Sequence, residues 1–140
     1  LTHEVGIETR TYFMLALPEE TRAMSYQTIK FAKKINPNFA YFYIFSPYPG
    51  TELWKIAGEK GQIMNIEWQC FSRWNPNYIP ANRTQKEIKH TFKSAYILFY
   101  LRPKYIINHL LNLKSTEDIK RSLRLVMQFI RGIFVLFKEY

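Results

Sequence analysis

The chain has 140 residues, 47% hydrophobic and 22% charged, a balance typical of a globular protein and not of a disordered one. No run of about 18 uncharged apolar residues occurs, so the sequence predicts no membrane-spanning helix. The single cysteine, Cys70, excludes an internal disulfide and, even with the three scattered histidines, falls short of the roughly four close ligands of structural zinc. We therefore expect a cytoplasmic protein with no metal ligands in this chain.

The charge is uneven along the chain. Residues 1–80 hold 8 Lys and Arg against 7 Asp and Glu, whereas residues 81–140 hold 12 against 4. The basic character of the whole chain, +9, therefore belongs to its second part, which indicates an acidic partner for that part.

The first predicted elements are a strand and a helix. Residues 11–17 are a continuous apolar run ending at Pro18, whose length and aromatic content favour a buried strand. Glu19 and Glu20 are suited to the first turn of a helix that runs to Ile35. The apolar side chains expected to share one face of this helix are Met24, Phe31, Ala32 and Ile35.

A second strand follows. Residues 36–38, Asn-Pro-Asn, end the helix, and residues 39–45 are apolar at every position. Such a run is typical of a strand that is buried on both faces of a parallel sheet covered by helices. The order strand, helix, strand therefore predicts a right-handed parallel unit.

The next segment is a loop and a short helix. In residues 46–51 two prolines fix φ and Gly50 permits a tight turn. Thr51 is placed to cap a helix over residues 52–59. Residues 62–82 are expected to be irregular and to pack over a core or a site.

The remaining chain is predicted to be helical. Residues 84–87, Thr-Gln-Lys-Glu, match a capping box. The apolar stripe after it is Ile88, Phe92, Ala95, Tyr96 and Phe99. Pro103 begins a short helix through Leu111, and a third helix, basic and with a wide apolar arc, is expected over residues 116–140.

Several strings, in order, resemble segments of radical S-adenosylmethionine proteins. YFMLALPEET at residues 12–21 resembles an apolar strand that ends in Gly-Leu-Pro-Gly-Glu-Thr, and TIKFAKKINP at residues 28–37 matches the segment after it. PYPGTEL at residues 47–53 resembles the family's Pro-Tyr-Pro-Gly-Thr loop. FYLRPKYI at residues 99–106 is similar to a helical tail of the branch that carries a cobalamin-binding domain.

The resemblance implies an α/β fold. Residues 1–82 would be the C-terminal part of a partial TIM barrel, two parallel strands with their crossover helix, and residues 83–140 a basic α-helical extension. A full barrel has about 250 residues, and two strands cannot bury both faces alone. The chain also begins at Leu1 rather than Met. We therefore expect its partner to be a missing N-terminal part of the same protein.

The resemblance also implies a reaction. The family cleaves S-adenosylmethionine reductively with a [4Fe–4S] cluster held by a Cys-x-x-x-Cys-x-x-Cys motif. Cys70 alone cannot hold that cluster, so this chain by itself is expected to be inactive. The parent protein is expected to use S-adenosylmethionine, the cluster and, in this branch, cobalamin, for methyl transfer or a related radical reaction on a hydrophobic substrate.

The part implied for this chain is a section of the wall around the adenosyl group, because barrel ligands lie at the C-terminal ends of strands. The candidate cofactor-binding residues are Ala16, Pro18, Glu20, Ser46 and Tyr48. No catalytic residue is expected in this chain.

Two positions depart from the family pattern, and three candidates have a simpler interpretation. Ala16 and Glu19 stand where the family has glycine, and we expect Glu19 to adopt a conformation that does not need a positive φ. The simpler interpretations are a solvated acid at a helix N-terminus for Glu20, an aromatic packed on the strand end for Tyr48, and turn chemistry for Ser46.

A second class of function stays open, a non-catalytic basic module. Residues 116–140 carry basic side chains around an apolar helix, which fits an interfacial helix on an anionic membrane as well as packing against other parts of a parent protein. The first alternative would make the protein peripheral to the membrane. Nucleic acid is not expected as a partner, because no recognised binding motif is present.

Overall fold

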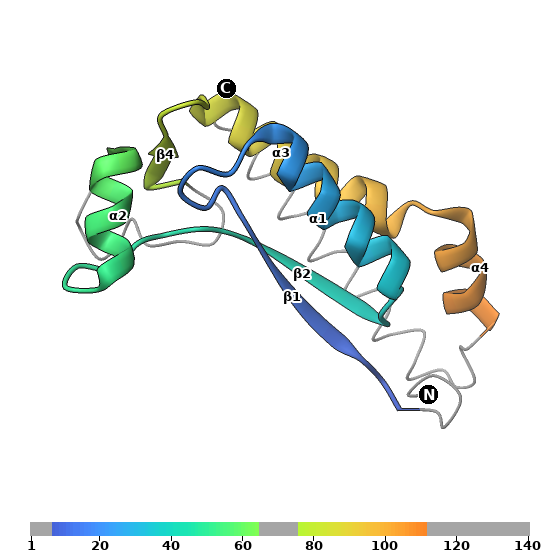
Figure 1. Cartoon of the computed structure of the whole chain (residues 1–140). Helices are drawn as coiled ribbons and strands as arrows, with labels where there is room; N and C mark the ends of the chain where they lie inside the picture. Colours follow the sequence, from blue (N-terminus) through green and yellow to red (C-terminus); the bar gives the residue numbers. More distant parts are fainter. Residues whose placement is uncertain (1–6, 65–75, 112–140) are drawn as a thin grey trace. The chain divides into compact units, whose positions relative to one another are not determined.

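The computed structural model describes residues 7–64 and 76–111, with side chains up to residue 107. In chain order the elements are β1 (Arg10–Leu15), α1 (Arg22–Ile35), β2 (Phe39–Ile44), α2 (Glu52–Lys60), β3 (Gly61–Ile63), β4 (Tyr78–Pro80), α3 (Gln85–Tyr100) and α4 (Pro103–Leu111) (Figure 1). The chain falls into two compact units, residues 1–99 and residues 100–140. The predicted division after residue 82 rests on charge and the resemblance, and it stays a prediction.

The β1 and β2 strands pair in parallel, with Arg10 opposite Phe39 and Leu15 opposite Ile44. The α1 helix makes the connection between them, which confirms the α/β class and the predicted strand, helix, strand order. The β1 strand ends two residues earlier than predicted because Ala16 turns the backbone to φ +64°.

Within the described part of the chain, one face of the β1–β2 pair is covered. The buried side chains of that face include Leu15, Ala40, Phe42 and Ile44. On the other face Tyr12 and Met14 are exposed by 66% and 49%. The expectation of a buried strand is therefore wrong for Tyr12 and Met14. The expectation of burial on both faces, made for residues 39–45, is wrong for Phe39, Tyr41 and Tyr43, which are half-buried. The physical reason is that α1 and α3 lie on the same side of the strand pair (Figure 1).

The α1 helix begins directly after Thr21, whose hydroxyl accepts a backbone N–H of the first turn at 3.3 Å. Glu19 and Glu20 precede this cap, so the prediction that they belong to the first turn is wrong. Asn36 ends the helix as predicted, in the left-handed conformation at φ 51°.

The α1 helix is rotated from its predicted stripe. Its buried side chains are Ser25, Ile29 and Ala32. Of the predicted stripe, Met24, Phe31 and Ile35 are exposed by 49%, 57% and 41%, so that prediction holds for Ala32 alone. A polar contact explains the rotation, because Ser25 is buried through hydrogen bonds to two charged side chains.

The α3 helix carries the predicted capping box and stripe. The Thr84 N–H donates to Glu87 Oε2 at 2.9 Å, and the Glu87 N–H donates to Thr84 Oγ1 at 3.3 Å. The stripe is buried except for Tyr96, which is half-buried. The Tyr96 hydroxyl accepts the Phe42 N–H at 3.2 Å and donates to the Phe42 carbonyl at 3.1 Å. One side chain of α3 therefore forms hydrogen bonds with both the N–H and the carbonyl of a β2 residue.

The segment predicted to be irregular contains a short antiparallel pair, β3 with β4, in which Gly61 lies opposite Pro80. The prediction is therefore wrong at the ends of that segment. The predicted cap of α2 is confirmed, since the Thr51 hydroxyl accepts the Trp54 N–H at 3.2 Å. Both strands contribute to a small apolar cluster. It is formed by Phe45, Ala57 and Tyr78, with Ile63 packed against it.

In the unit of residues 100–140, α4 begins at Pro103 as predicted. The Tyr105 ring meets the Tyr100 ring edge-on at 5.2 Å. The Arg102 guanidinium lies over the Tyr105 ring, 5.8 Å from its centroid. None of the helices in the described ranges is long and apolar enough to cross a membrane. Cys70 and the predicted helix of residues 116–140 lie outside the described residues.

Candidate functional site

The carboxyl ends of β1 and β2 lie at one edge of the sheet because the two strands are parallel. The chain stays at this edge just beyond the strands, where the Phe45 N–H donates to the Leu15 carbonyl at 2.8 Å. We call residues 16–20 and 45–51, which leave from these two ends, the sheet rim. All five predicted binding residues lie on the sheet rim, three on the first loop and two on the second.

The first loop holds two non-glycine residues in the left-handed conformation, Ala16 at φ 64° and Glu19 at φ 63°. The expectation that Glu19 avoids a positive φ is therefore wrong. This conformation costs roughly 1–2 kcal/mol for a residue with a Cβ. The backbone thus keeps the shape that glycine favours at both positions where the family pattern has glycine.

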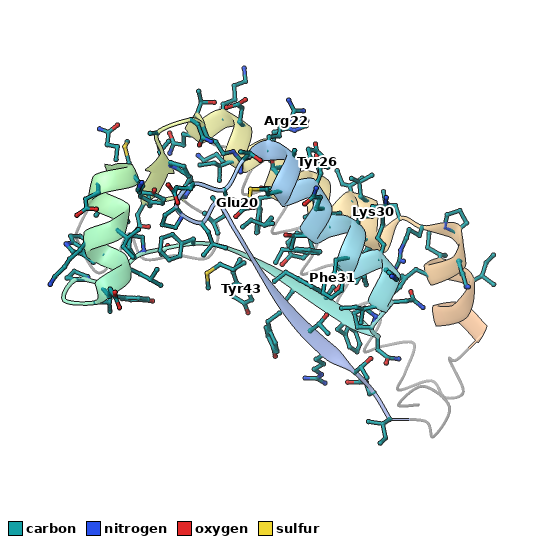
Figure 2. The ribbon with its side chains drawn as sticks, in the orientation of Figure 1. Glu20, Arg22, Tyr26, Lys30, Phe31 and Tyr43 are labelled. Atoms are coloured by element: carbon teal, nitrogen blue, oxygen red, sulfur yellow. The ribbon has the colours of Figure 1, made fainter. Side chains whose placement is uncertain are left out.

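Glu20 is buried, with 5% of its surface exposed, so it is not the solvated acid of the simpler interpretation. Its Oε2 accepts the Leu17 N–H at 2.8 Å, and its Oε1 accepts the Ser25 hydroxyl at 2.5 Å. Figure 2 shows Glu20 between the end of β1 and the start of α1. The carboxylate therefore ties the turn of the first loop to the first turns of α1.

A buried arginine completes this arrangement. Arg83 lies between β4 and α3 with 7% of its surface exposed, and its Nη1 donates to Ser25 Oγ at 2.9 Å. Its Nη2 donates to Thr91 Oγ1, also at 2.9 Å. Burial lowers the pKa of Arg83, whereas the negative charge of Glu20 raises it. The Ser25 hydroxyl thus bridges a buried cation and a buried anion.

Sequence analysis missed Ser25 and Arg83. Ser25 lies inside a helix for which the pattern predicts an apolar stripe of other residues, and Arg83 lies 58 residues further along the chain. The one signal available was the departure from periodicity at Ser25, since a polar residue on the buried side of a helix needs a partner.

The second loop contributes Ser46 and Tyr48. Tyr48 is exposed by 51%, and its carbonyl accepts the Thr51 hydroxyl at 2.7 Å. The Oγ of Ser46 is buried and finds no hydrogen-bond partner within the described part of the chain. On the first loop, Pro18 is half-buried and Ala16 fully buried. The geometry therefore brings the five candidates to one edge, with different degrees of access.

Tyr78 is a neighbour that the sequence did not single out. It is fully buried, and its ring meets the Phe45 ring edge-on at 5.6 Å. Burial, and then the charge of Glu19, raise the pKa of Tyr78. Gly61 makes room for this ring, because a Cβ there would lie 2.7 Å from the tyrosine oxygen. That hydroxyl has no partner among the described residues.

The uncovered face of the β1–β2 pair carries aromatic side chains. Tyr12 and Tyr41 stack with ring centroids 5.2 Å apart, and Tyr43 lies at 6.1 Å from Tyr12. At the amino end the Arg10 guanidinium lies over the Phe39 ring at 5.6 Å. An exposed aromatic face of a parallel strand pair is unusual, because such sheets are normally covered on both sides.

The donor set does not fit an iron–sulfur cluster. The chain has one cysteine, and in residues 7–64 and 76–107 no three His, Cys, Asp or Glu side chains are grouped closely enough to hold a metal ion. Three thiolates for a cluster would therefore have to come from outside this chain.

Comparison with known proteins gives two curated relatives. Over 119 residues, 85% of this chain, the sequence is 35% identical to an uncharacterized methyltransferase of Pyrococcus horikoshii. Over 106 residues, 76% of this chain, it is 26% identical to the anaerobic magnesium-protoporphyrin IX monomethyl ester cyclase of Rubrivivax gelatinosus. The matches span 26% and 19% of those two proteins. No family model matches the chain, and no solved structure matches it.

Proposed function

We propose that this chain is the C-terminal part of a radical S-adenosylmethionine enzyme of the cobalamin-binding branch, and that its sheet rim forms part of the wall of the S-adenosylmethionine pocket. The observation that carries the proposal is the parallel pairing of β1 with β2, which brings the loops after both strands to one edge. Ligands of β/α folds bind at that edge.

The backbone of the first loop supports the proposal. Ala16 and Glu19 keep positive φ values although neither is glycine, so the loop retains the shape that the family pattern encodes with glycine. Glu20, inside the same turn, uses both carboxylate oxygens to hold that shape. Its part in the pocket is then to fix the loop that faces the cosubstrate.

The outer edge of β2 and the uncovered face of the strand pair both support a partial barrel. Tyr96 takes the N–H and the carbonyl of Phe42, so at this point β2 has no backbone groups left for a further strand. The uncovered face with Tyr12 and Met14 needs a cover, which the remaining strands of a barrel would supply. In this arrangement β2 is the last strand, and the others continue from the free edge of β1.

The two curated relatives support a role of this segment in binding S-adenosylmethionine more than they support any one reaction. One is named a methyltransferase and the other a cyclase, so the segment that both share with this chain is better suited to a common pocket than to one substrate. We propose methyl transfer or a related radical reaction for the parent protein. The cluster and cobalamin would be held by residues outside this chain.

The test begins with the DNA upstream of Leu1. We expect the same reading frame to encode a Cys-x-x-x-Cys-x-x-Cys motif roughly one to two hundred residues earlier, within barrel-scale distance. The full-length protein, reconstituted with iron and sulfide and then reduced, should release 5′-deoxyadenosine from S-adenosylmethionine. A start codon and promoter directly before Leu1, or a full-length protein that releases none, would contradict the proposal.

The second proposal is a basic module on an anionic membrane, and it rests on the charge of residues 81–140, 12 Lys and Arg against 4 Asp and Glu. A peptide of residues 116–140 would then co-sediment with anionic liposomes at low salt and be released at high salt. Failure to bind at low salt rules this proposal out.

A further inference from the structure

Arg83 is a buried arginine whose guanidinium donates to Ser25 of α1 and to Thr91 of α3. An arginine stays charged in proteins, so burying its guanidinium costs free energy unless an anion and hydrogen-bond acceptors compensate. The compensation comes from Ser25 of α1, whose hydroxyl accepts from Arg83 and donates to Glu20 of the sheet rim, itself only 5% exposed. Arg83 and Glu20 are therefore two ends of one buried relay through a hydroxyl.

The far end of this relay is the strained turn of the first loop. Glu20 holds the Leu17 N–H at 2.8 Å, and the Glu20 N–H donates to the Leu17 carbonyl at 3.0 Å. The turn between them contains Glu19 in the left-handed conformation, and Ala16 just before it has the same conformation. Such a backbone persists only where its surroundings hold it.

We propose that Arg83 is a positioning residue of the S-adenosylmethionine pocket, acting through Ser25 and Glu20 to hold residues 16–20 in their ligand-ready shape. The inference rests on the proposed function for the identity of the ligand. The second guanidinium bond, to Thr91, anchors Arg83 to α3, whose capping box fixes the start of that helix. The loop is therefore braced by a helix that begins more than 60 residues after it in the chain.

The experiment compares Arg83→Met with Arg102→Met in the full-length protein. Arg102 is a half-buried arginine of the other compact unit, beside Tyr105, and it makes none of the contacts that join Arg83, Ser25 and Glu20. We expect Arg83→Met to weaken binding of S-adenosylhomocysteine, measured by calorimetry, by about tenfold, the worth of one charge-assisted hydrogen bond. Arg102→Met should leave this affinity unchanged.

A second readout follows the loop without any ligand. Hydrogen exchange of the Leu17 amide should accelerate in Arg83→Met, because its acceptor Glu20 loses its anchor, while the Phe45 amide at the strand end stays protected. Unchanged exchange at Leu17 together with unchanged affinity would overturn the proposal, even if the melting temperature fell. If the wild type binds no S-adenosylhomocysteine, the proposed function fails, and exchange at Leu17 alone decides the role of Arg83.

A double variant keeps the test usable if Arg83→Met does not fold. Arg83→Met with Glu20→Gln removes both buried charges, so it should recover folding. It should still bind S-adenosylhomocysteine weakly, because the relay to the loop is gone. Full affinity in a folded double variant would overturn the proposal.

Discussion

Glu19 shows how a side chain and a backbone requirement conflict at one residue. Its φ of 63° suits glycine, yet its carboxylate forms an exposed ion pair with Lys60 at 2.9 Å. Ala16 has the same backbone conformation but is fully buried. At both residues the loop shape is imposed by contacts outside the residue itself, chiefly the bonds made by Glu20.

We expect Glu19→Gly to stabilise the protein relative to Glu19→Ala. Both variants lose the ion pair, but only glycine relieves the left-handed conformation, and the net gain should be about 0.5–1 kcal/mol after the entropy of glycine is counted. Urea unfolding of the two variants measures the difference. Equal stability would show that the loop holds no strain at this position.

Two tyrosine hydroxyls give a second comparison. The Tyr78 hydroxyl is buried without a partner in the described residues, so Tyr78→Phe should leave stability unchanged or raise it by up to about 1 kcal/mol. Tyr96→Phe leaves the Phe42 N–H and carbonyl unpaired and should cost about 1–3 kcal/mol. Thermal unfolding checks both, and a clear loss for Tyr78→Phe would reveal a partner for its hydroxyl.

At the scale of elements, local signals define the ends of helices while burial decides their rotation. Thr51 and the Thr84–Glu87 capping box each begin a helix as predicted. Thr21 also caps a helix, although the prediction placed the first turn of α1 at Glu19 and Glu20. The face that α1 buries follows instead from the partners of Ser25.

The capping box of α3 predicts a pH dependence. The backbone N–H of Thr84, and then its hydroxyl, lower the pKa of Glu87 below its usual range. Because the folded pKa is depressed, the contribution to stability is present above the unfolded pKa, about 4.3. It is lost as the pH falls through the folded value. The stability difference between wild type and Glu87→Gln, measured by urea unfolding, should therefore disappear as the pH falls through the folded pKa of Glu87.

At the scale of the whole molecule, one face of the β1–β2 pair stays uncovered by the residues that the structure describes. Tyr12, Met14 and Tyr43 lie on strands whose other face is packed, and Figure 2 shows Tyr43 on the side of the sheet away from α1. A parallel pair of strands is stable when both faces are covered. The proposed barrel would turn this face into its interior.

Two methionines of equal exposure test that arrangement. Met14 on the uncovered sheet face and Met24 on α1 are both exposed by 49%. In the full-length protein we expect hydrogen peroxide to oxidise Met24 readily and Met14 about tenfold more slowly, since oxidation follows access to the sulfur. Mass spectrometry of peptides reports both rates. Similar rates would contradict coverage of the sheet face.

Much of the candidate site was accessible from sequence, because the strings around residues 12–21 and 47–53 carry it as local motifs. The parallel pairing that brings these strings together is confirmed. Whether Ala16, Pro18, Glu20, Ser46 and Tyr48 bind a cofactor stays a prediction. The relay to Arg83 could not be predicted, since its members have no periodic or local relation to one another.

The sequence by itself determined the strand, helix, strand order of residues 10–44 and the caps at Asn36, Thr51 and Thr84, because a threonine before a helix or an asparagine after it acts within a few residues. The tertiary structure alone decided which side of α1 is buried, that the described residues cover only one face of the β1–β2 pair, and that Ala16 and Glu19 take positive φ. These outcomes depend on hydrogen bonds and packing between segments distant in the chain, whose free energies outweigh the local preference of a single residue.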